Sequence, residues 1–273
     1  MSGLRMIFLG YILGILIGIC LGIMGAGGAV LTVPVLVYIM HVDAELATTY
    51  SLFIVGTTAL IGSMGYLKND QYNVKAILFF GIPSFVSVFI TARFLVPIIP
   101  ENLFTIGEHV ITRGVGIMIM FAFFMFVSSI AMMRSYRRIK QEDIKQAGRY
   151  RYGLILLQGL LVGIIIAPLG AGGGFLIIPA LVLLCKLPMK QAVGSSLILI
   201  TINSAIGFIG KLTPEIIIDW KFLLTFSIFT VTGILTGIFL SRYMTGQRLR
   251  YYFAWFILLI GVIVLTQEIT HFK

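Results

Sequence analysis

A glycine-rich sequence, Gly25-Ala-Gly-Gly-Ala-Val-Leu-Thr-Val-Pro34, occurs again 145 residues further along the chain (25 against 170) as Gly170-Ala-Gly-Gly-Gly-Phe-Leu-Ile-Ile-Pro179. The similarity continues on both sides of this motif without a gap. The matched pairs include Gly14 with Gly159, Gly18 with Gly163, Ser51 with Ser196, and Gly62 with Gly207. Agreement at one offset over so many positions indicates an internal repeat. The sequence therefore predicts two homologous halves.

The composition indicates that these halves lie in a lipid bilayer. Of the 273 residues, 59% are hydrophobic and 11% are charged, whereas an average soluble domain has about 25% charged residues. The uncharged runs from Met6 to His41 and from Gly153 to Cys185 exceed the roughly 20 residues that span the hydrocarbon layer. A soluble core of this size cannot bury so much apolar surface, so we expect a multi-pass protein of the cell membrane.

Each half is predicted to hold one interrupted apolar segment followed by three full spans. In the first half these are 6–40 with a break near 25, then 46–67, 74–96 and 110–133, and in the second half 152–185 with a break near 170, then 191–211, 220–241 and 250–268. The interrupted segments are too long for one straight span, and the pieces after the breaks are too short to cross alone. A helix that enters, a glycine turn and a short returning helix fit these lengths.

The predicted fold is an all-α integral membrane protein of two homologous halves arranged as inverted repeats, each with a glycine-broken helical hairpin and three transmembrane helices. Residues 1–133 form the N-terminal transmembrane repeat, 134–151 a basic cytoplasmic loop, and 152–273 the C-terminal transmembrane repeat. The inversion follows from an odd number of crossings per half, and with it we expect the termini on opposite faces. Parallel halves are the alternative, which the distribution of Lys and Arg does not exclude.

The net charge of +10 is concentrated in the connection between the halves. Residues 134–151 carry seven Lys and Arg residues against Glu142 and Asp143. A short basic connection is typical of the cytoplasmic side of a membrane protein. The charge is therefore expected to set the orientation and to contact anionic lipid, not to bind nucleic acid.

The two glycine breaks are the predicted binding site. Non-helical backbone at membrane depth is tolerated only where it is buried in protein or lines a wet cavity, and the free N–H groups of a helix that begins there attract an anion. Close packing of helices through small residues is the alternative reading. The residues assigned to the breaks are Gly25, Ala26, Gly27, Gly28, Gly170, Ala171, Gly172, Gly173 and Gly174.

Small polar side chains on the following spans are expected to complete the pocket, because they can donate hydrogen bonds to an anion. The candidates are Ser51, Thr58, Ser195, Ser196, Asn203 and, in one half only, Gln191. For each hydroxyl, a bond back to its own helix is the competing interpretation. Lys68 and Lys211 follow the same helix of each half and could form an electrostatic entrance, but we do not expect them to be ligands.

Three other classes of function fit less well. A membrane enzyme needs a polar cluster at membrane depth, whereas His41, His109 and His271 all fall at span ends. A scaffold or assembly protein without substrate gives no reason for duplicated glycine breaks. A cation or metal permease would need intramembrane carboxylates. No cofactor is expected, and the expected partners are a small anion, the bilayer and, in a homodimer, a second copy of the chain.

The glycine motifs with Pro34 and Pro179, followed by Ala192-Val193-Gly194-Ser195-Ser196-Leu197, resemble the TauE/SafE sulfite exporter family of membrane permeases. The resemblance covers nearly the whole chain. It implies two related halves of about four membrane segments each, and a secondary carrier for sulfite, thiosulfate, sulfonates and similar anions. Ala29 stands where the second motif has Gly174, so the second half matches the family pattern more closely.

Overall fold

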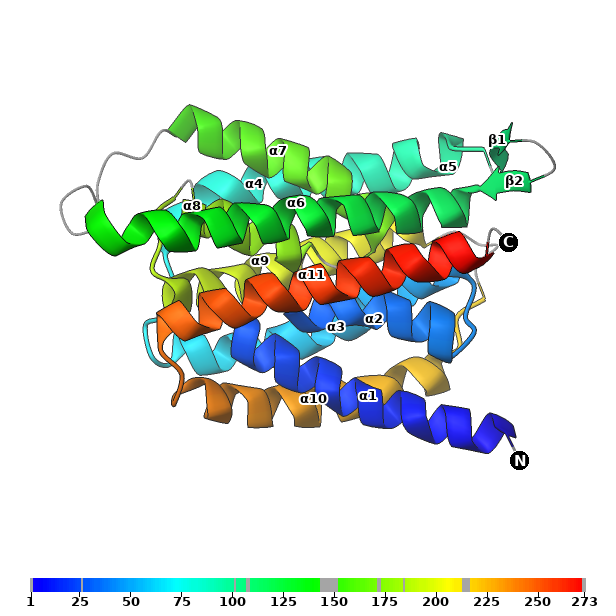
Figure 1. The fold of residues 1–273 in the computed structure, drawn as a ribbon, viewed down its shortest axis with the longest axis horizontal. Coiled ribbons are helices and arrows are strands. Elements are labelled where there is room, and N and C mark those ends of the chain that lie inside the picture. The colour runs from blue at the N-terminus through cyan, green and yellow to red at the C-terminus, as the bar shows by residue number, and fades with distance from the viewer. Residues whose placement is uncertain are drawn as a thin grey trace.

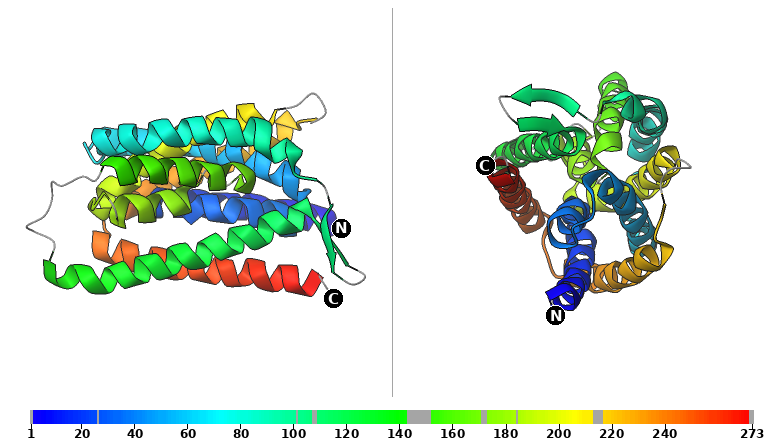
Figure 2. Two further views of the ribbon diagram at one scale, coloured as in Figure 1. Left: turned by 90° about the horizontal axis from the view of Figure 1, so that it is seen from above. Right: turned by 90° about the vertical axis from the view of Figure 1, so that its right-hand side faces the viewer.

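Figure 1 shows the fold as a computed structural model, which describes residues 2–25, 27–100, 102–106, 109–142, 152–170, 173–183, 185–212 and 217–271. Three of the predicted site residues, Ala26, Ala171 and Gly172, lie outside the described residues. The described chain is a bundle of helices whose axes run along one common direction (Figures 1 and 2).

In the described residues up to 142, the chain forms eight helical elements and one β-hairpin. They are α1 (Ser2–Met24), α2 (Gly27–Pro34), the π-helix η1 (Val35–Ile39), α3 (Ala44–Leu67), α4 (Val74–Ile90), the π-helix η2 (Thr91–Leu95), α5 (Val96–Ile98), β1 (Asn102–Ile106), β2 (His109–Thr112) and α6 (Arg113–Glu142). The second part holds α7 (Tyr152–Leu169), α8 (Gly174–Leu183), α9 (Met189–Lys211), α10 (Trp220–Ser241) and α11 (Gly246–His271).

Six helical segments of the described chain are long and apolar enough to cross a membrane. They are 44–67, 74–98, 113–134, 189–211, 220–241 and 246–268. Four shorter apolar helices, at 8–24, 28–39, 153–169 and 174–183, flank the two breaks. This confirms the predicted pattern of one interrupted segment and three full spans on each side of the basic connection.

The two interrupted segments form hairpins that enter the bundle from opposite ends. In Figure 1, α1 starts at the end that carries the β-hairpin, whereas α7 starts at the other end. The start of α1 and the end of α11 lie at the same end of the bundle (Figures 1 and 2). The prediction that the termini lie on opposite faces is therefore wrong, because two odd numbers of crossings add to an even number.

The β-hairpin between α5 and α6 was not predicted. β1 and β2 pair antiparallel, with Asn102 opposite Thr112 and Thr105 opposite Val110. β-branched residues are frequent in this connection, as they are in strands generally. The hairpin is only two short strands long, so hydropathy over membrane-length windows does not detect it.

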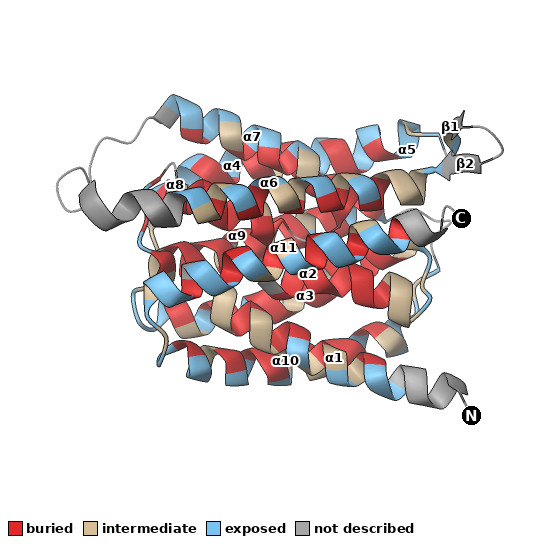
Figure 3. Cartoon of the chain, in the orientation of Figure 1, coloured by how far each residue is buried: buried red, intermediate tan, exposed pale blue. Residues whose placement is uncertain are grey.

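α3 and α9 lie at the centre of the bundle. In each of these helices 67% of the span is buried inside the protein, against 39% to 44% in the other four spans. Figure 3 shows the same division, with exposed residues gathered on the outward faces of helices such as α7, α10 and α11. These outer faces carry large apolar side chains, among them Ile82, Ile228 and Leu259, as expected of surfaces in contact with lipid.

Two pairs of outer helices join the first and second parts of the chain: α1 packs along α10, and α7 packs along α4. Glycines allow the close approach in both pairs: a Cβ atom on Gly18 would lie 2.0 Å from the Thr230 carbonyl oxygen, and one on Gly159 would lie 2.3 Å from the Phe80 carbonyl oxygen. Small residues commonly permit such contacts between helices in membranes. α6 packs along α11, and the short helices α2 and α8 contact each other.

Candidate functional site

The first break lies between α1 and α2. Gly25 has φ of +74°, a left-handed conformation that favours glycine, and its N–H donates to the Leu21 carbonyl at 2.7 Å. A Cβ atom on Gly25 would lie 2.7 Å from Val193 Cγ1 and 3.1 Å from Ser196 Oγ. The first turn of chain after α1 therefore rests against the beginning of α9.

The second break, between α7 and α8, repeats this geometry. Gly170 has φ of +66°, and its N–H donates to the Ile166 carbonyl at 3.1 Å. A Cβ atom on Gly170 would lie 2.3 Å from Thr48 Cβ and 2.4 Å from the Thr48 carbonyl oxygen. This turn therefore rests against the beginning of α3.

The two turns lie at different levels of the bundle. α3 and α9 are antiparallel, because the start of α3 meets the end of α9 at Thr48 and Lys211, while the end of α3 meets the start of α9 at Tyr66 and Gly194. The Gly25 turn is thus displaced toward one end and the Gly170 turn toward the other. The helices α2 and α8, which begin just beyond the turns, contact each other between them.

Two of the predicted polar residues lie at or near the breaks. Ser196 borders the Gly25 turn, as given above, and its hydroxyl donates to the Val193 carbonyl at 2.8 Å. Ser51 is fully buried on α3, one turn beyond Thr48. Its hydroxyl has no hydrogen-bond partner among the described residues, which is unusual for a buried polar group.

Two other predicted residues, Asn203 and Thr58, bind neighbouring helices instead. Asn203 Nδ2 donates to Ser84 Oγ of α4 at 3.0 Å. Thr58 Oγ1 lies 2.6 Å from Thr230 Oγ1 of α10 and also donates to its own helix, to the Ile54 carbonyl at 2.6 Å. These side chains join the central helices to the outer ones.

Ser195 and Gln191 lie in the first turns of α9. Ser195 Oγ accepts the Asn73 N–H at 2.9 Å, next to the start of α4. Gln191 is half-buried. Neither is placed against a glycine turn by the described contacts.

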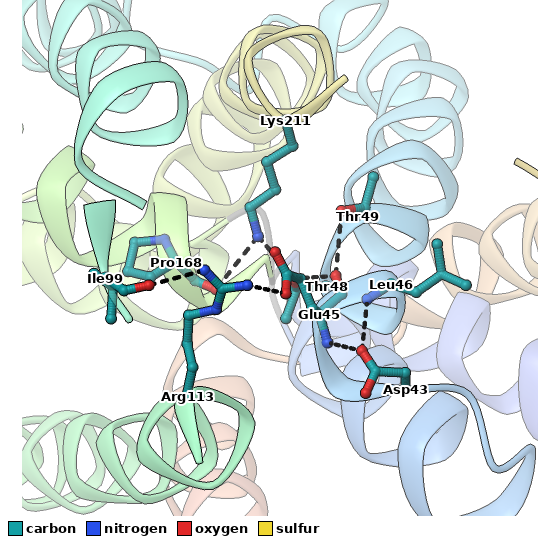
Figure 4. Close-up of polar contacts among 9 residues, drawn as sticks. All are labelled: Asp43, Glu45, Leu46, Thr48, Thr49, Ile99, Arg113, Pro168 and Lys211. Atoms are coloured by element: carbon teal, nitrogen blue, oxygen red, sulfur yellow. Dashed lines mark hydrogen bonds and ion pairs between the residues drawn. The ribbon is translucent and has the colours of Figure 1, made fainter. Parts of the chain in front are cut away.

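Lys211 is the residue that sequence reasoning placed incorrectly. It is not a surface group at an entrance, since only 7% of the residue is exposed, whereas Lys68 is exposed. Its Nζ donates to Thr48 Oγ1 at 2.7 Å and to the Pro168 carbonyl at 3.4 Å (Figure 4). The sequence offered one indication that Lys211 is buried. It lies four residues after Gly207 and so shares a helix face with it, and Gly207 matches Gly62 in the repeat.

A charged pair lies beside Lys211. Arg113 of α6 forms an ion pair with Glu45 of α3 and donates from Nη1 to the Ile99 carbonyl at 3.0 Å (Figure 4). Asp43 caps α3 by accepting the Glu45 N–H at 2.9 Å, a usual role for Asp at a helix start. The α3 start, the α6 start and the α9 end are thereby tied together.

Cavities lie at both ends of the bundle. The one beside the Glu45–Arg113 pair has a volume of about 740 Å³ and is also lined by Tyr38 and Glu268. The one at the opposite end has a volume of about 260 Å³, and its lining includes Tyr66. Tyr66 donates its hydroxyl to the Gly22 carbonyl at 3.0 Å, so Tyr66 touches the end of α1 as Lys211 touches the end of α7.

The sulfite exporter TauE/SafE family model matches residues 10–264. The chain belongs to the TauE/SafE family. A protein of Methanocaldococcus jannaschii, named a probable membrane transporter protein, is 29% identical over 213 residues that cover 75% of this chain and 72% of that protein. The probable membrane transporter protein YdhB of Bacillus subtilis is 26% identical over 223 residues, covering 81% of this chain and 85% of that protein. No solved structure matches the chain.

Membership of TauE/SafE identifies a multi-pass membrane protein of a transporter family, not an enzyme. It confirms the resemblance seen in the glycine motifs. Within the part of the chain that the structure describes, no cluster of three or more His, Cys, Asp or Glu side chains is placed to hold a metal ion. The buried polar side chains of the described residues are mostly Ser and Thr hydroxyls, together with the amide of Asn203, the ammonium group of Lys211 and the carboxylate of Glu268.

Proposed function

We propose that this protein is a secondary transporter of a small anion, sulfite or a related sulfur oxyanion or organosulfonate, which binds at the two glycine breaks inside the bilayer. The observation that carries this proposal is that two short buried helices, α2 and α8, begin just after left-handed glycines inside the bundle and contact each other. Helix starts offer free N–H groups and the positive end of the helix dipole.

The anion preference follows from the chemistry of these helix starts. Each helix N-terminus is equivalent to about half a positive charge, and such ends bind phosphate, sulfate and carboxylate groups in many proteins. Ser51, buried without a described partner, offers a further donor one turn beyond Thr48, the residue that contacts Gly170. The names of the matched relatives describe transport without a substrate, and the family description supplies the sulfite class.

We also propose that residues 1–133 and 152–273 are inverted repeats, joined by the basic connection. The crossed packing supports this, because α1 pairs with α10 while α7 pairs with α4. The turns support it too: Gly25 contacts Val193 and Gly170 contacts Thr48, and each member of one contact lies at the repeat offset from a member of the other. Transporters with inverted repeats expose a central site alternately to the two sides.

The two end cavities suit such a cycle. Each lies at one end of the bundle, one lined by Glu45 and Arg113 and the other by Lys190 and Tyr66. Rocking of one repeat against the other would connect the anion to one cavity at a time. No Gly-x-x-x-x-Gly-Lys-Ser/Thr phosphate loop occurs in the sequence, consistent with a gradient as the energy source.

Uptake into liposomes tests the function directly. Liposomes that contain the purified protein should accumulate radiolabelled sulfite or thiosulfate. Imposing a proton gradient or a membrane potential should show which gradient drives the uptake. Empty liposomes and protein with Gly170→Leu serve as controls. A wild-type protein that moves none of the sulfur oxyanions or small sulfonates, while remaining folded and monodisperse, would contradict the proposal.

Labelling of introduced cysteines tests the orientation. The end of α3 lies at the same end of the bundle as the start of α7, and the start of α10 lies at the opposite end (Figure 1). Asn69→Cys should therefore react with an impermeant reagent only from the cytoplasm, and Asp219→Cys only from outside. The reverse pattern would overturn the cytoplasmic assignment of residues 134–151.

A further inference from the structure

Among the described residues, the hydrogen-bond partners of the buried Lys211 are both neutral. Its Nζ donates to the Thr48 hydroxyl at 2.7 Å and to the Pro168 carbonyl at 3.4 Å. The ion pair found among the described residues joins Arg113 to Glu45 and leaves Lys211 outside it. An ammonium group taken out of water is strongly destabilised unless a counter-charge compensates it.

The charged side chains that act on Lys211 from other helices are Glu45 of α3 and Arg113 of α6. Glu45 is already paired with Arg113, so its negative charge is offset there. On its other side, Arg93 of η2 donates to the Leu212 carbonyl at 3.4 Å. The surroundings of Lys211 therefore hold more positive than negative charge. A charged residue kept inside a membrane protein under these conditions points to a ligand.

The position of Lys211 connects it to the second glycine turn. Thr48 is the shared contact: its Oγ1 accepts from Lys211, while its backbone lies against Gly170. Pro168 precedes that turn by two residues, and α8 begins just after it at Gly174. Ser51, with its unpartnered hydroxyl, follows Thr48 by three residues on the same helix face. The ammonium group therefore lies beside the Gly170 turn, and the Ser51 hydroxyl lies one turn further along α3.

At the first break, the described residue that corresponds to Lys211 is neutral. Tyr66 occupies the position that corresponds to Lys211 in the repeat, since 211 minus 145 is 66. Its hydroxyl donates to the Gly22 carbonyl at 3.0 Å and to Ser241 Oγ at 3.3 Å. The contact with the end of the preceding helix is the same, but the group that makes it is neutral.

From this asymmetry we infer that Lys211 is the cationic ligand of the transported anion, and that the anion is held at the α7–α8 break. The inference rests on the proposed function and adds to it which break binds and which side chain supplies the charge. The ligand class is a small oxyanion with one or two negative charges, such as sulfite. On binding, the ammonium group exchanges a neutral hydroxyl and carbonyl for a charged oxygen, a stronger interaction in a buried site.

Titration of purified protein with sulfite tests this assignment. Lys211→Met keeps an unbranched side chain of similar length and should weaken sulfite affinity by at least about tenfold, the usual effect of losing a charge-assisted hydrogen bond. Tyr66→Phe, at the matched position of the other break, and Lys68→Met, an exposed cation, should each change affinity by less than about threefold.

The melting temperature without anion separates ligand binding from a structural role. Removing an uncompensated buried charge should leave that temperature unchanged or raise it, while the stabilisation produced by sulfite disappears. A Lys211→Met protein that melts earlier without anion but binds sulfite as the wild type does would overturn the inference alone. Wild-type protein that shows no shift with sulfite, thiosulfate or a small sulfonate would overturn the proposed function together with it.

Discussion

The Gly25 turn and the Gly170 turn are built alike and surrounded differently. Both use a left-handed glycine after an apolar helix, and both rest against the start of a central helix. A tyrosine hydroxyl meets the helix end at the first turn, and a buried ammonium group meets it at the second. The two breaks therefore share one backbone conformation but differ in their side chains: a charged Lys211 lies at the second break, and a neutral Tyr66 lies at the first.

The largest expected effect comes from placing a side chain on either turn. Gly25→Leu and Gly170→Leu should each abolish sulfite uptake. A side chain is strained at these positive φ angles, and Val193 or Thr48 already occupies the space that the new Cβ would need. Gly153→Leu is the matched control, since a Cβ there meets nothing within 4 Å. Uptake assays with protein quantified in the membrane provide the measurement. Normal uptake by both turn variants would show that these glycines serve only the close packing of helices.

Introducing a lysine at the neutral first break tests whether charge is what distinguishes the two breaks. Tyr66→Lys should create a second anion site, because the Gly22 carbonyl and the Ser241 hydroxyl would surround an ammonium group as Pro168 and Thr48 surround Lys211. Calorimetric titration with sulfite should then show two anions bound per chain in place of one. An unchanged stoichiometry in a folded variant would mean that charge alone does not distinguish the two breaks.

The polar pairs that join the central helices to the outer ones should affect stability, not anion binding. Asn203 with Ser84 and Thr58 with Thr230 each join a central helix to an outer one. A double-mutant cycle of Asn203→Ala with Ser84→Ala should give a coupling free energy of about 0.5 to 1.5 kcal/mol, the range for hydrogen bonds between membrane helices. Thermal unfolding measures this coupling. A tenfold loss of sulfite affinity in Asn203→Ala with unchanged stability would place Asn203 at the anion instead.

The smallest effect is expected at the Glu45–Arg113 pair. The Glu45 side chain is 44% exposed, so water screens the pair, and Glu45→Gln should cost no more than about 1 kcal/mol of stability. Sulfite affinity should rise slightly, because a negative charge near Lys211 is removed. Asp43→Asn, in the same segment but engaged with backbone N–H groups, is the control. Weaker sulfite binding in Glu45→Gln would show that Glu45 holds Lys211 in position.

Hydropathy and glycine placement were enough to predict the membrane spans and the two helix breaks of this fold, but not the β-hairpin. The six spans, the two interrupted segments and the turns near residues 25 and 170 follow from stretches of apolar residues and from where glycine interrupts them. These are local properties: a segment is long enough to cross the bilayer, or a glycine allows a turn, whatever packs beside it. The family could be named from the same motifs.

The tertiary structure alone decided which polar groups meet. Asn203 and Thr58 were reasonable candidates for an anion pocket, yet each faces a hydroxyl more than one hundred residues away in sequence. Lys211 stands at the end of a span, where a lysine normally reaches water, but the packing of α3, α7 and α9 around it buries the ammonium group. Sequence periodicity shows which face of a helix is apolar. Which neighbour covers that face depends on contacts between distant segments, because burial is a property of the whole packed bundle.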